Sequence, residues 1–494
     1  MCEEATRSPR GLLGAVFVLY VAAVSFTAWH HEPWFDEAQA WLIARDSGLI
    51  ELLTDRLRYE GSPGLWHLLL AVPAKLGLPY RTISLISVTL AIATVFLFLR
   101  YSPFTWHVKA LFPFGFFTIY QYAVVARSYV LMALVLVALA AVYHRRNERP
   151  VLWFFLLGLL ANVNVHGFFI AGFLAAYHLV QLAIHRRQLP ARTLRAHGVG
   201  AVVLGSIAVL EILQLLPPDD LSFPADSTNF RCMILLALPF TPRVVSSIPV
   251  LAFSAFLFWR RRLLLVWLGP TAAVLWIFVF KTASCWHEGI IYYYWVFCLW
   301  IALDAPPRAA DRPPDAAAGQ LAMAANVMMI LVLAVQVYWG MICAARDVLY
   351  AYSGSQAASR YLAEHRLTDR EIYACGYSTV SLLPYFPENI FDNYHGKRNP
   401  SYYLWAEGNA LARPFDHARR QRPEFILVGV KTPRTKPQRT TGYTLRRRFL
   451  GALYWKDGFL EADSFYLYQR IDLAGPNHPE RDQTALAGPH KPLE

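Results

Sequence analysis

Long runs of apolar residues recur through the first 343 positions of this 494-residue chain. A helix that spans the hydrocarbon core of a bilayer needs roughly 20 mostly apolar residues. The candidate runs are 11–29, 64–78, 82–99, 108–125, 128–143, 151–164, 166–184, 197–216, 244–259, 263–280, 289–303 and 321–343. They predict a polytopic α-helical membrane domain over residues 1–343, with about 11–12 membrane helices.

The composition favours the same fold class. Charged residues make up 16% of the chain and hydrophobic residues 56%, whereas a soluble protein carries roughly 25% charged residues. The net charge of +12 is explained by basic cytoplasmic loops, so we expect the lipid bilayer as a partner and no nucleic acid. The six cysteines show no CxxC or Cys/His spacing, and no metal site is inferred from them.

Basic loops orient the predicted helices. When crossings are counted, four basic segments fall on the side of the N-terminus, which the positive-inside rule makes the cytoplasm. These segments begin at Arg145, Arg186, Arg260 and Arg308. The count requires that one apolar run between 30 and 145 be incomplete or re-entrant. The candidate is the short 64–78 run, which contains Pro73 and follows Pro63, or its junction with the 82–99 run.

The composition changes after residue 343. A helical pattern covers 355–366, and strand-like runs bounded by Pro, Gly and Asn cover 371–377, 424–430 and 464–470. Residues 344–470 are therefore expected to form a soluble α/β domain, which the topology places outside the cytoplasm. The tail 471–494 is rich in Pro, Gly and charge, and we expect it to be disordered.

The first predicted outer loop, residues 30–63, carries the densest chemistry. Its apolar positions recur at roughly helical spacing with charged residues between them, which predicts an amphipathic helix in the outer membrane interface. Asp36 and Glu37 stand at the start of this helix, where carboxylates cap free N–H groups and are favoured by the helix dipole. Capping alone would account for both residues, so further context is needed to assign them a function.

A resemblance of this sequence to known enzymes supplies that context. An acidic pair after the first membrane helix, an amphipathic outer loop and a Pro-containing start of the second helix resemble the GT-C glycosyltransferases. The closest likeness is to the bacterial dolichyl-phosphate-mannose-type and lipopolysaccharide-core (RgtA/B/C/D-like) families. Those enzymes commonly read His-Pro-Pro-Leu at the second helix, whereas this chain reads GSPGLW over 61–66, with His67 next to it.

Two later segments extend the resemblance over residues 11–185. YQYAVVARSY, residues 120–129, is similar to a basic and tyrosine-containing motif at the outer end of a membrane helix, with Tyr122, Arg127 and Tyr129 as the matching positions. NVNVHGFF, residues 162–169, resembles a Thr-His-Tyr type site and contributes His166.

The resemblance implies transfer of a sugar from a polyprenyl-phosphate carrier. A phosphate leaving group needs no general acid, so the site must supply a base for the acceptor hydroxyl and cations for the phosphate. Asp36 is the candidate base, with Glu37 supporting it or binding the acceptor. Arg127 is the candidate phosphate ligand because a guanidinium binds phosphate bidentately and stays charged. The alternative is that Arg127 only anchors the end of a membrane helix.

Other basic and aromatic residues rank lower as substrate-binding candidates. Lys281 and His287 lie in the outer loop 281–289, but snorkelling at a helix end explains such a lysine and an interfacial position explains such a histidine. His166 fits either a satisfied membrane histidine or a residue lining the site.

The sequence thus predicts an inverting glycosyltransferase in a bacterial cytoplasmic membrane, with a cytoplasmic N-terminus and an extracytoplasmic C-terminal domain. A polyprenyl-phosphate-linked sugar is the expected donor and an extracytoplasmic glycan, lipid or protein the acceptor; no other cofactor is assigned and metal dependence stays open. Two alternatives remain open. They are a polytopic transporter or flippase for a lipid-linked glycan, and a catalytically inactive GT-C relative.

Overall fold

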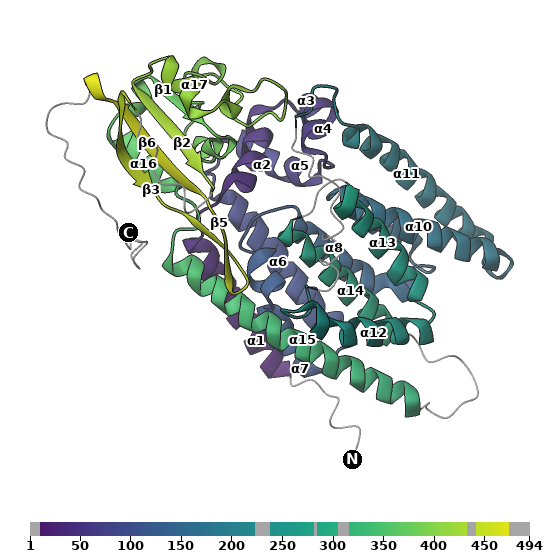
Figure 1. The fold of residues 1–494 in the computed structure, drawn as a ribbon. Coiled ribbons are helices and arrows are strands. Elements are labelled where there is room, and N and C mark those ends of the chain that lie inside the picture. The colour runs from purple at the N-terminus through teal and green to yellow at the C-terminus, as the bar shows by residue number, and fades with distance from the viewer. Residues whose placement is uncertain (1–9, 223–237, 281–283, 305–315, 432–440, 474–494) are drawn as a thin grey trace.

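The computed structural model describes residues 10–222, 238–280, 284–304, 316–431 and 441–473. It is mostly helical, and its named strands all lie after residue 371 (Figure 1). The helices are α1 Arg10–His30, α2 Phe35–Asp46, α3 Leu49–Glu51, α4 Leu57–Glu60, α5 Leu65–Lys75, α6 Thr82–Tyr101, α7 Trp106–Leu111, α8 Tyr129–Val142, α9 Pro150–Ala161, α10 Val165–His185, α11 Ala191–Leu215, α12 Val244–Arg260, α13 Leu264–Phe280, α14 Glu288–Leu303, α15 Ala316–Leu349, α16 Ser355–Glu364 and α17 Phe415–Arg420.

Five helices of the described chain are long and apolar enough to cross a membrane, namely α1, α6, α10, α11 and α15. The apolar helices α5, α8, α9, α12 and α13 are shorter. The expected membrane domain is therefore supported as a multi-pass helical domain. The finer expectation of 11–12 membrane helices requires that shorter helices also cross, and it stays a prediction.

The helices form a bundle around α14, whose residues from Glu288 to Ala302 are all buried. The basic loop after α8 lies at the C-terminal end of α14, because His144 there is hydrogen-bonded to the Ile301 carbonyl. Trp286 and His287 precede the opposite end of the same helix. The bundle therefore has two ends, which lie about 24 Å apart along α14. The basic loop after α8 marks one end, and Glu288, the first residue of α14, marks the other, called here the Glu288 end.

The short helix α5 stays at the Glu288 end of the bundle. Its first residue, Leu65, donates its N–H to the carbonyl of Asn162 at the end of α9, and Lys75 in its last turn donates to the carbonyl of Ser47. Eleven residues reach only about 16 Å. This short length fits the 64–78 run as the incomplete one among the runs between 30 and 145.

The 108–125 run departs from the expected continuous helix. It contains the end of α7, a 3-10 turn at Phe112–Phe114 and a π-helical turn at Phe117–Gln121. Pro113 and Gly115 explain the break, because proline removes a backbone donor and Gly115 is in an extended conformation. The loop that follows, residues 122–128, is almost entirely buried.

The C-terminal region contains a four-stranded mixed sheet with strand order β1-β2-β6-β3. Strands β1 and β2 are parallel, and β6 is antiparallel to both β2 and β3. The strands are β1 Ile372–Cys375, β2 Phe425–Val430, β3 Tyr443–Phe449, β4 Ala452–Trp455, β5 Gly458–Ala462 and β6 Ser464–Arg470. The predicted helix and the three predicted strands correspond to α16, β1, β2 and β6, whereas β3, β4 and β5 were not expected.

Side chains alternate across this sheet as strand geometry requires. Phe425 and Leu427 of β2 face the large core shared with the helical bundle, whereas Ile426 packs with Phe415 of α17 in a separate small core. The sheet therefore joins the C-terminal region to the bundle on one face only. The first three residues of the predicted disordered tail, Ile471–Leu473, form a 3-10 turn. The rest of the tail, residues 474–494, lies outside the described residues.

A hairpin formed by β4 and β5 extends from this region along α15 into the helical bundle (Figure 1). The ring of Trp455 packs edge-on against Phe116 at 4.9 Å. At the turn, Lys456 donates to Glu288 at 2.5 Å and to the Leu238 carbonyl at 3.0 Å. Both members of this ion pair are almost completely buried, so the hairpin is fixed to the start of α14.

The predicted first outer loop, residues 30–63, is helical but does not form the one continuous amphipathic helix that was expected. It breaks after Asp46, and α2 is buried on nearly all sides. The polar face of α2 binds the C-terminal region: the Gln39 amide exchanges two hydrogen bonds with the backbone of Tyr403, and Asp46 accepts from the Ser401 N–H. The charged and polar positions therefore serve domain docking in place of solvent exposure.

Candidate functional site

Asp36 and Arg127 form an ion pair at the Glu288 end of the bundle. The Arg127 Nη1 atom lies 2.9 Å from Asp36 Oδ2, and the two side chains are 20% and 22% exposed. Asp36 is placed by the first turn of α2, and Arg127 by the loop before α8. The structure thus brings together the two residues that the sequence ranked first as base and phosphate ligand.

The guanidinium of Arg127 is also held by aromatic rings. Its Cζ atom lies 5.0 Å from the ring centroid of Tyr129 and 5.1 Å from that of Trp286. Cation–π contacts of this kind hold the charge while leaving guanidinium N–H groups free to bind oxygen. Tyr129 was among the motif positions that the sequence selected, whereas Trp286 was not selected for this role.

Glu37 has different surroundings from Asp36, its neighbour in sequence. Its side chain is fully buried, and Oε1 accepts the Ala126 N–H at 2.7 Å. Oε2 accepts from the Trp34 N–H at 3.1 Å and from His31 Nε2 at 3.0 Å. A fully buried carboxylate with these partners is not placed to bind the acceptor, and Glu37 instead anchors the loop that carries Arg127. Whether Glu37 supports Asp36 stays a prediction.

His31 links this anchor to a second carboxylate. Its Nδ1 atom lies 2.7 Å from Asp347 near the end of α15, and the His31 side chain is fully buried. Burial alone would lower the pKa of His31, but Asp347 and Glu37 outweigh it and raise the pKa to about 10. A protonated His31 therefore ties together the end of α1, the start of α2 and the end of α15.

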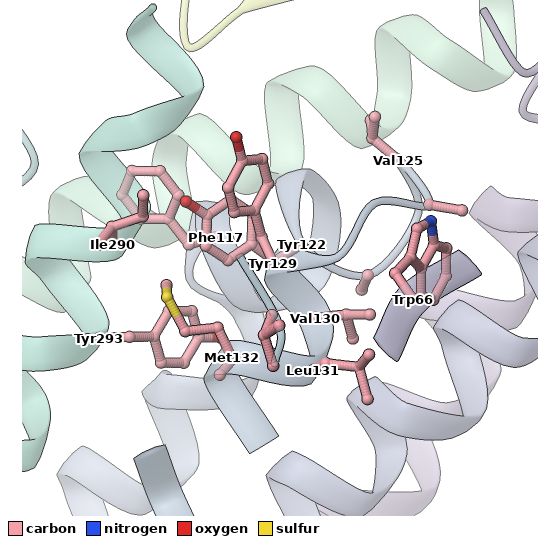
Figure 2. Packing of buried hydrophobic residues seen from close by; sticks show 14 of the residues in the cluster. Trp66, Phe117, Tyr122, Val125, Tyr129, Val130, Leu131, Met132, Ile290 and Tyr293 are labelled. Atoms are coloured by element: carbon pink, nitrogen blue, oxygen red, sulfur yellow. The ribbon is translucent and has the colours of Figure 1, made fainter. Parts of the chain in front are cut away.

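Tyr122 and Tyr129 belong to one aromatic cluster. Their rings are stacked with centroids 5.0 Å apart, and Tyr122 also stacks on Tyr293 of α14. Figure 2 shows both rings together with Phe117 and Tyr293 beside Ile290. The Tyr122 hydroxyl donates to the Trp286 carbonyl at 2.7 Å. Tyr129 thus contacts Arg127 directly, whereas Tyr122 acts by fixing the backbone of Trp286.

His166 and His287 lie next to each other behind this cluster, with ring centroids 5.0 Å apart. Both are buried. Burial, followed by the neighbouring His166 and Arg127, lowers the pKa of His287 well below its usual range. Its Nδ1 accepts the Ser284 N–H at 2.9 Å, so the neutral ring carries its proton on Nε2. Lys281, the remaining candidate, lies outside the described residues.

Further ionisable residues surround Asp36 that sequence reasoning did not select. Glu60 of α4 accepts from Gln39 at 2.9 Å, and burial and Asp36 raise its pKa to about 7 although the Gln39 hydrogen bond opposes the shift. Asp463 has a pKa raised to about 6, by burial first and by Glu461 and Asp36 among the charges. Burial raises the pKa of Glu461 in the hairpin; Lys431 opposes this shift and Asp36 adds to it. Glu461 and Asp463 lie far from residues 30–63 in sequence, whereas Glu60 lies within that segment. No local pattern indicated any of the three.

Within the described part of the chain, no group of three or more His, Cys, Asp or Glu residues has the arrangement of a metal site. Two cavities of about 390 and 190 Å³ lie elsewhere, one beside Trp259 and Gln320 and the other beside Asn393 and His417. Neither cavity is lined by Asp36 or Arg127.

Comparison with known proteins identifies no relative: no family model matches the chain, and neither does any curated protein.

Proposed function

We propose that this protein is an inverting, GT-C-type membrane glycosyltransferase that transfers a sugar from a polyprenyl phosphate to an acceptor hydroxyl. One observation carries the proposal. A carboxylate and a guanidinium from distant segments pair at 2.9 Å while both remain about one-fifth exposed. A base and a phosphate ligand are the two groups that this reaction needs, and partial exposure leaves both within reach of a substrate.

In the proposed reaction, phosphate oxygens of the donor bind Arg127 and compete with Asp36 for it. Release from the ion pair frees the Asp36 carboxylate to accept the proton of the acceptor hydroxyl. The acceptor oxygen then forms a bond to the anomeric carbon, and the bond from that carbon to the phosphate oxygen breaks. Polyprenyl phosphate leaves with the electron pair, and the configuration at the anomeric carbon is inverted.

The surrounding contacts support this division of roles. Glu37 accepts the N–H of Ala126, the residue before Arg127, so the same α2 turn that carries the base also positions the cation. A buried loop must satisfy its backbone donors, and Glu37 does so at this point. Tyr129 and Trp286 hold the guanidinium from its apolar side. We assign Glu37 as a positioning residue and Asp36 as the base.

The apolar helices support a bilayer location for a lipid-linked donor. The first outer loop, the 217–222 segment and the C-terminal region meet at one end of the molecule, where Ser222 donates its N–H to Trp405 and Tyr59 donates to Asp220. The basic loop after α8 lies at the other end. By the positive-inside rule we propose that the site faces outward from a bacterial cytoplasmic membrane, with the N-terminus in the cytoplasm.

Product analysis distinguishes the proposal from its alternatives. Purified protein is reconstituted in liposomes with a polyprenyl-phosphate sugar that is radiolabelled in the sugar, together with a glycan and lipid extract of the producing cells. We expect label to move from the polyprenyl phosphate to the extract. Movement of intact donor across the bilayer with no cleavage of the sugar–phosphate bond would identify a flippase instead, and neither transfer nor movement would identify an inactive relative.

Variants of Arg127 test its role in the same assay. Arg127→Ala removes the phosphate ligand, and we expect a loss of about 10²-fold or more in transfer, in the range of charge-stabilising groups in active sites. Arg127→Lys retains the charge but not bidentate geometry, and it should recover part of the activity. Wild-type activity in Arg127→Ala, with folding intact by size-exclusion chromatography, would contradict the assignment.

A further inference from the structure

A second cluster of aromatic rings adjoins Asp36 on the side of the C-terminal region. The Phe35 ring packs edge-on against Tyr377 with centroids 4.8 Å apart, and Tyr377 lies 5.5 Å from Trp405. Trp405 in turn contacts Tyr403 at 4.8 Å. Phe35 and Tyr403 are buried, whereas Tyr377 and Trp405 are only half-buried. The buried rings thus support two rings that reach the surface.

Lys431 completes this cluster with a positive charge. Its Nζ atom lies 4.8 Å from the ring centroid of Tyr377 and 5.2 Å from that of Trp34. Its one ion pair in the described chain is with Glu461, at 3.4 Å, and the two side chains are about one-quarter exposed. An ammonium carries three N–H donors, so Lys431 keeps donor capacity beyond this partner.

The cluster lies next to the proposed base. Phe35 directly precedes Asp36 in α2, and Lys431 Nζ lies 5.7 Å from the centroid of the Phe35 ring. The rings come from α2 and from the C-terminal region, which the docking contacts of Gln39 hold together. Partly exposed aromatic rings beside a few polar groups are the usual composition of a small-molecule site. Trp34, which lies 5.2 Å from Lys431 Nζ, packs edge-on against Trp286 at 5.7 Å, so the cluster also adjoins the ring that holds Arg127.

We propose that Tyr377, Trp405 and Lys431 form the acceptor subsite and bind a sugar ring of the acceptor next to Asp36. The inference rests on the proposed function and specifies it: the acceptor is a glycan or glycolipid. One face of a sugar ring presents C–H groups, which pack on the electron-rich faces of aromatic rings. The ammonium of Lys431 donates hydrogen bonds to hydroxyl oxygens at the edge of the same sugar.

The test separates acceptor binding from donor binding. Labelled polyprenyl-phosphate sugar and the cell extract are each titrated, and the half-saturating amount of each is measured for the wild type and for Tyr377→Ala and Trp405→Ala. Loss of one stacking contact of about 1.4 kcal/mol raises the half-saturating amount of extract about tenfold. The half-saturating amount of donor should stay within a factor of about two, because Arg127 is untouched.

Controls exclude a general loss of structure. Tyr373→Ala removes another half-buried tyrosine of the same region, one that lines the cavity beside His417, and should leave both titrations unchanged. Tyr377→Phe and Trp405→Phe keep an aromatic face and should restore most of the acceptor binding, whereas Lys431→Met should weaken it. The subsite is overturned if the half-saturating amount of extract is unchanged in both alanine variants. It is also overturned if the half-saturating amount of donor changes by the same factor as that of the extract. A wild type that transfers no sugar would instead contradict the proposed function itself.

Discussion

Adjacent carboxylates in α2 have opposite surroundings. Successive helical residues are rotated by about 100°, so Asp36 reaches the partly exposed surface while Glu37 points into the bundle, where its oxygens accept from Ala126, Trp34 and His31. Residue type alone could not separate these roles. The acidic pair and Arg127 were identified from the sequence, but only the fold shows which carboxylate remains accessible.

Loss of the Glu37 charge should destabilise the protein. Glu37→Gln keeps an acceptor for the Ala126 N–H but leaves protonated His31 without one of its two carboxylates. Removal of one partner of a buried ion pair costs about 3 kcal/mol, measured as a lower midpoint of thermal or chemical denaturation in detergent. Glu51→Gln is the matched control, since its pair with Arg56 is much more exposed and contributes less than about 1 kcal/mol. Equal effects of the two variants would contradict the anchoring role.

The raised pKa of His31 predicts how stability depends on pH. The folded protein holds the His31 proton up to pH about 10, whereas the unfolded chain releases it near about 6.5. The contribution of His31 to the free energy of unfolding is therefore complete below about pH 6.5 and decreases as the pH rises toward about 10. Denaturation midpoints of wild type and His31→Asn should converge across this window. If the difference between the two midpoints stays constant from about pH 6 to about pH 10, a charged His31 is contradicted.

Secondary structure was predictable where a sequence pattern dominates. Strands β2 and β6 are rich in β-branched, aromatic and other apolar residues, and both were expected. Strand β3 was not, because Arg446, Arg447 and Arg448 interrupt its apolar pattern; it is an edge strand, where charged residues prevent further pairing. The β4–β5 hairpin turns at Lys456 and Asp457, between Trp455 and Gly458, and its strands of four and five residues are too short to give a clear alternating pattern.

The β4–β5 hairpin should depend on its buried ion pair. Lys456→Met leaves Glu288 unpaired at the start of α14, and Glu288→Leu leaves Lys456 unpaired; each should lower the free energy of unfolding by about 3–5 kcal/mol. The double variant replaces both charges by apolar groups and should recover most of that loss. Chemical denaturation of the four proteins forms a double-mutant cycle. Additive losses would show that Lys456 and Glu288 do not act as a pair.

At the scale of the whole molecule, the candidate site combines segments that the sequence keeps far apart. Asp36, Arg127 and Trp286 come from three parts of the bundle, and Lys431 and Glu461 come from the C-terminal region. Hydropathy predicted the long apolar helices, and loop charge required one incomplete run, for which the segment of α5 was a candidate. They carry no information on which side chains meet across domains, so Lys431, Glu60 and the Tyr377–Trp405 rings emerged only from the fold.

Cysteine accessibility tests the proposed orientation. Glu407 of the C-terminal region and Glu148 in the loop after α8 are both exposed, and the proposed topology places them on opposite sides of the membrane. In intact cells, a membrane-impermeant maleimide should label Glu407→Cys above the background of the parent protein. It should label Glu148→Cys only after the cells are lysed. Labelling of both variants in intact cells would contradict the topology.

The most direct test of the central claim is the effect of Asp36→Asn on the transfer reaction itself. The variant keeps the size of the side chain and removes its basicity, and general-base catalysis contributes about 10²- to 10⁴-fold to rate. With a labelled polyprenyl-phosphate sugar, we predict that the wild type forms a glycoside of inverted anomeric configuration, read by NMR, and that Asp36→Asn is slower by about 10³-fold. Transfer by Asp36→Asn at the wild-type rate would contradict the assignment of Asp36 as the base.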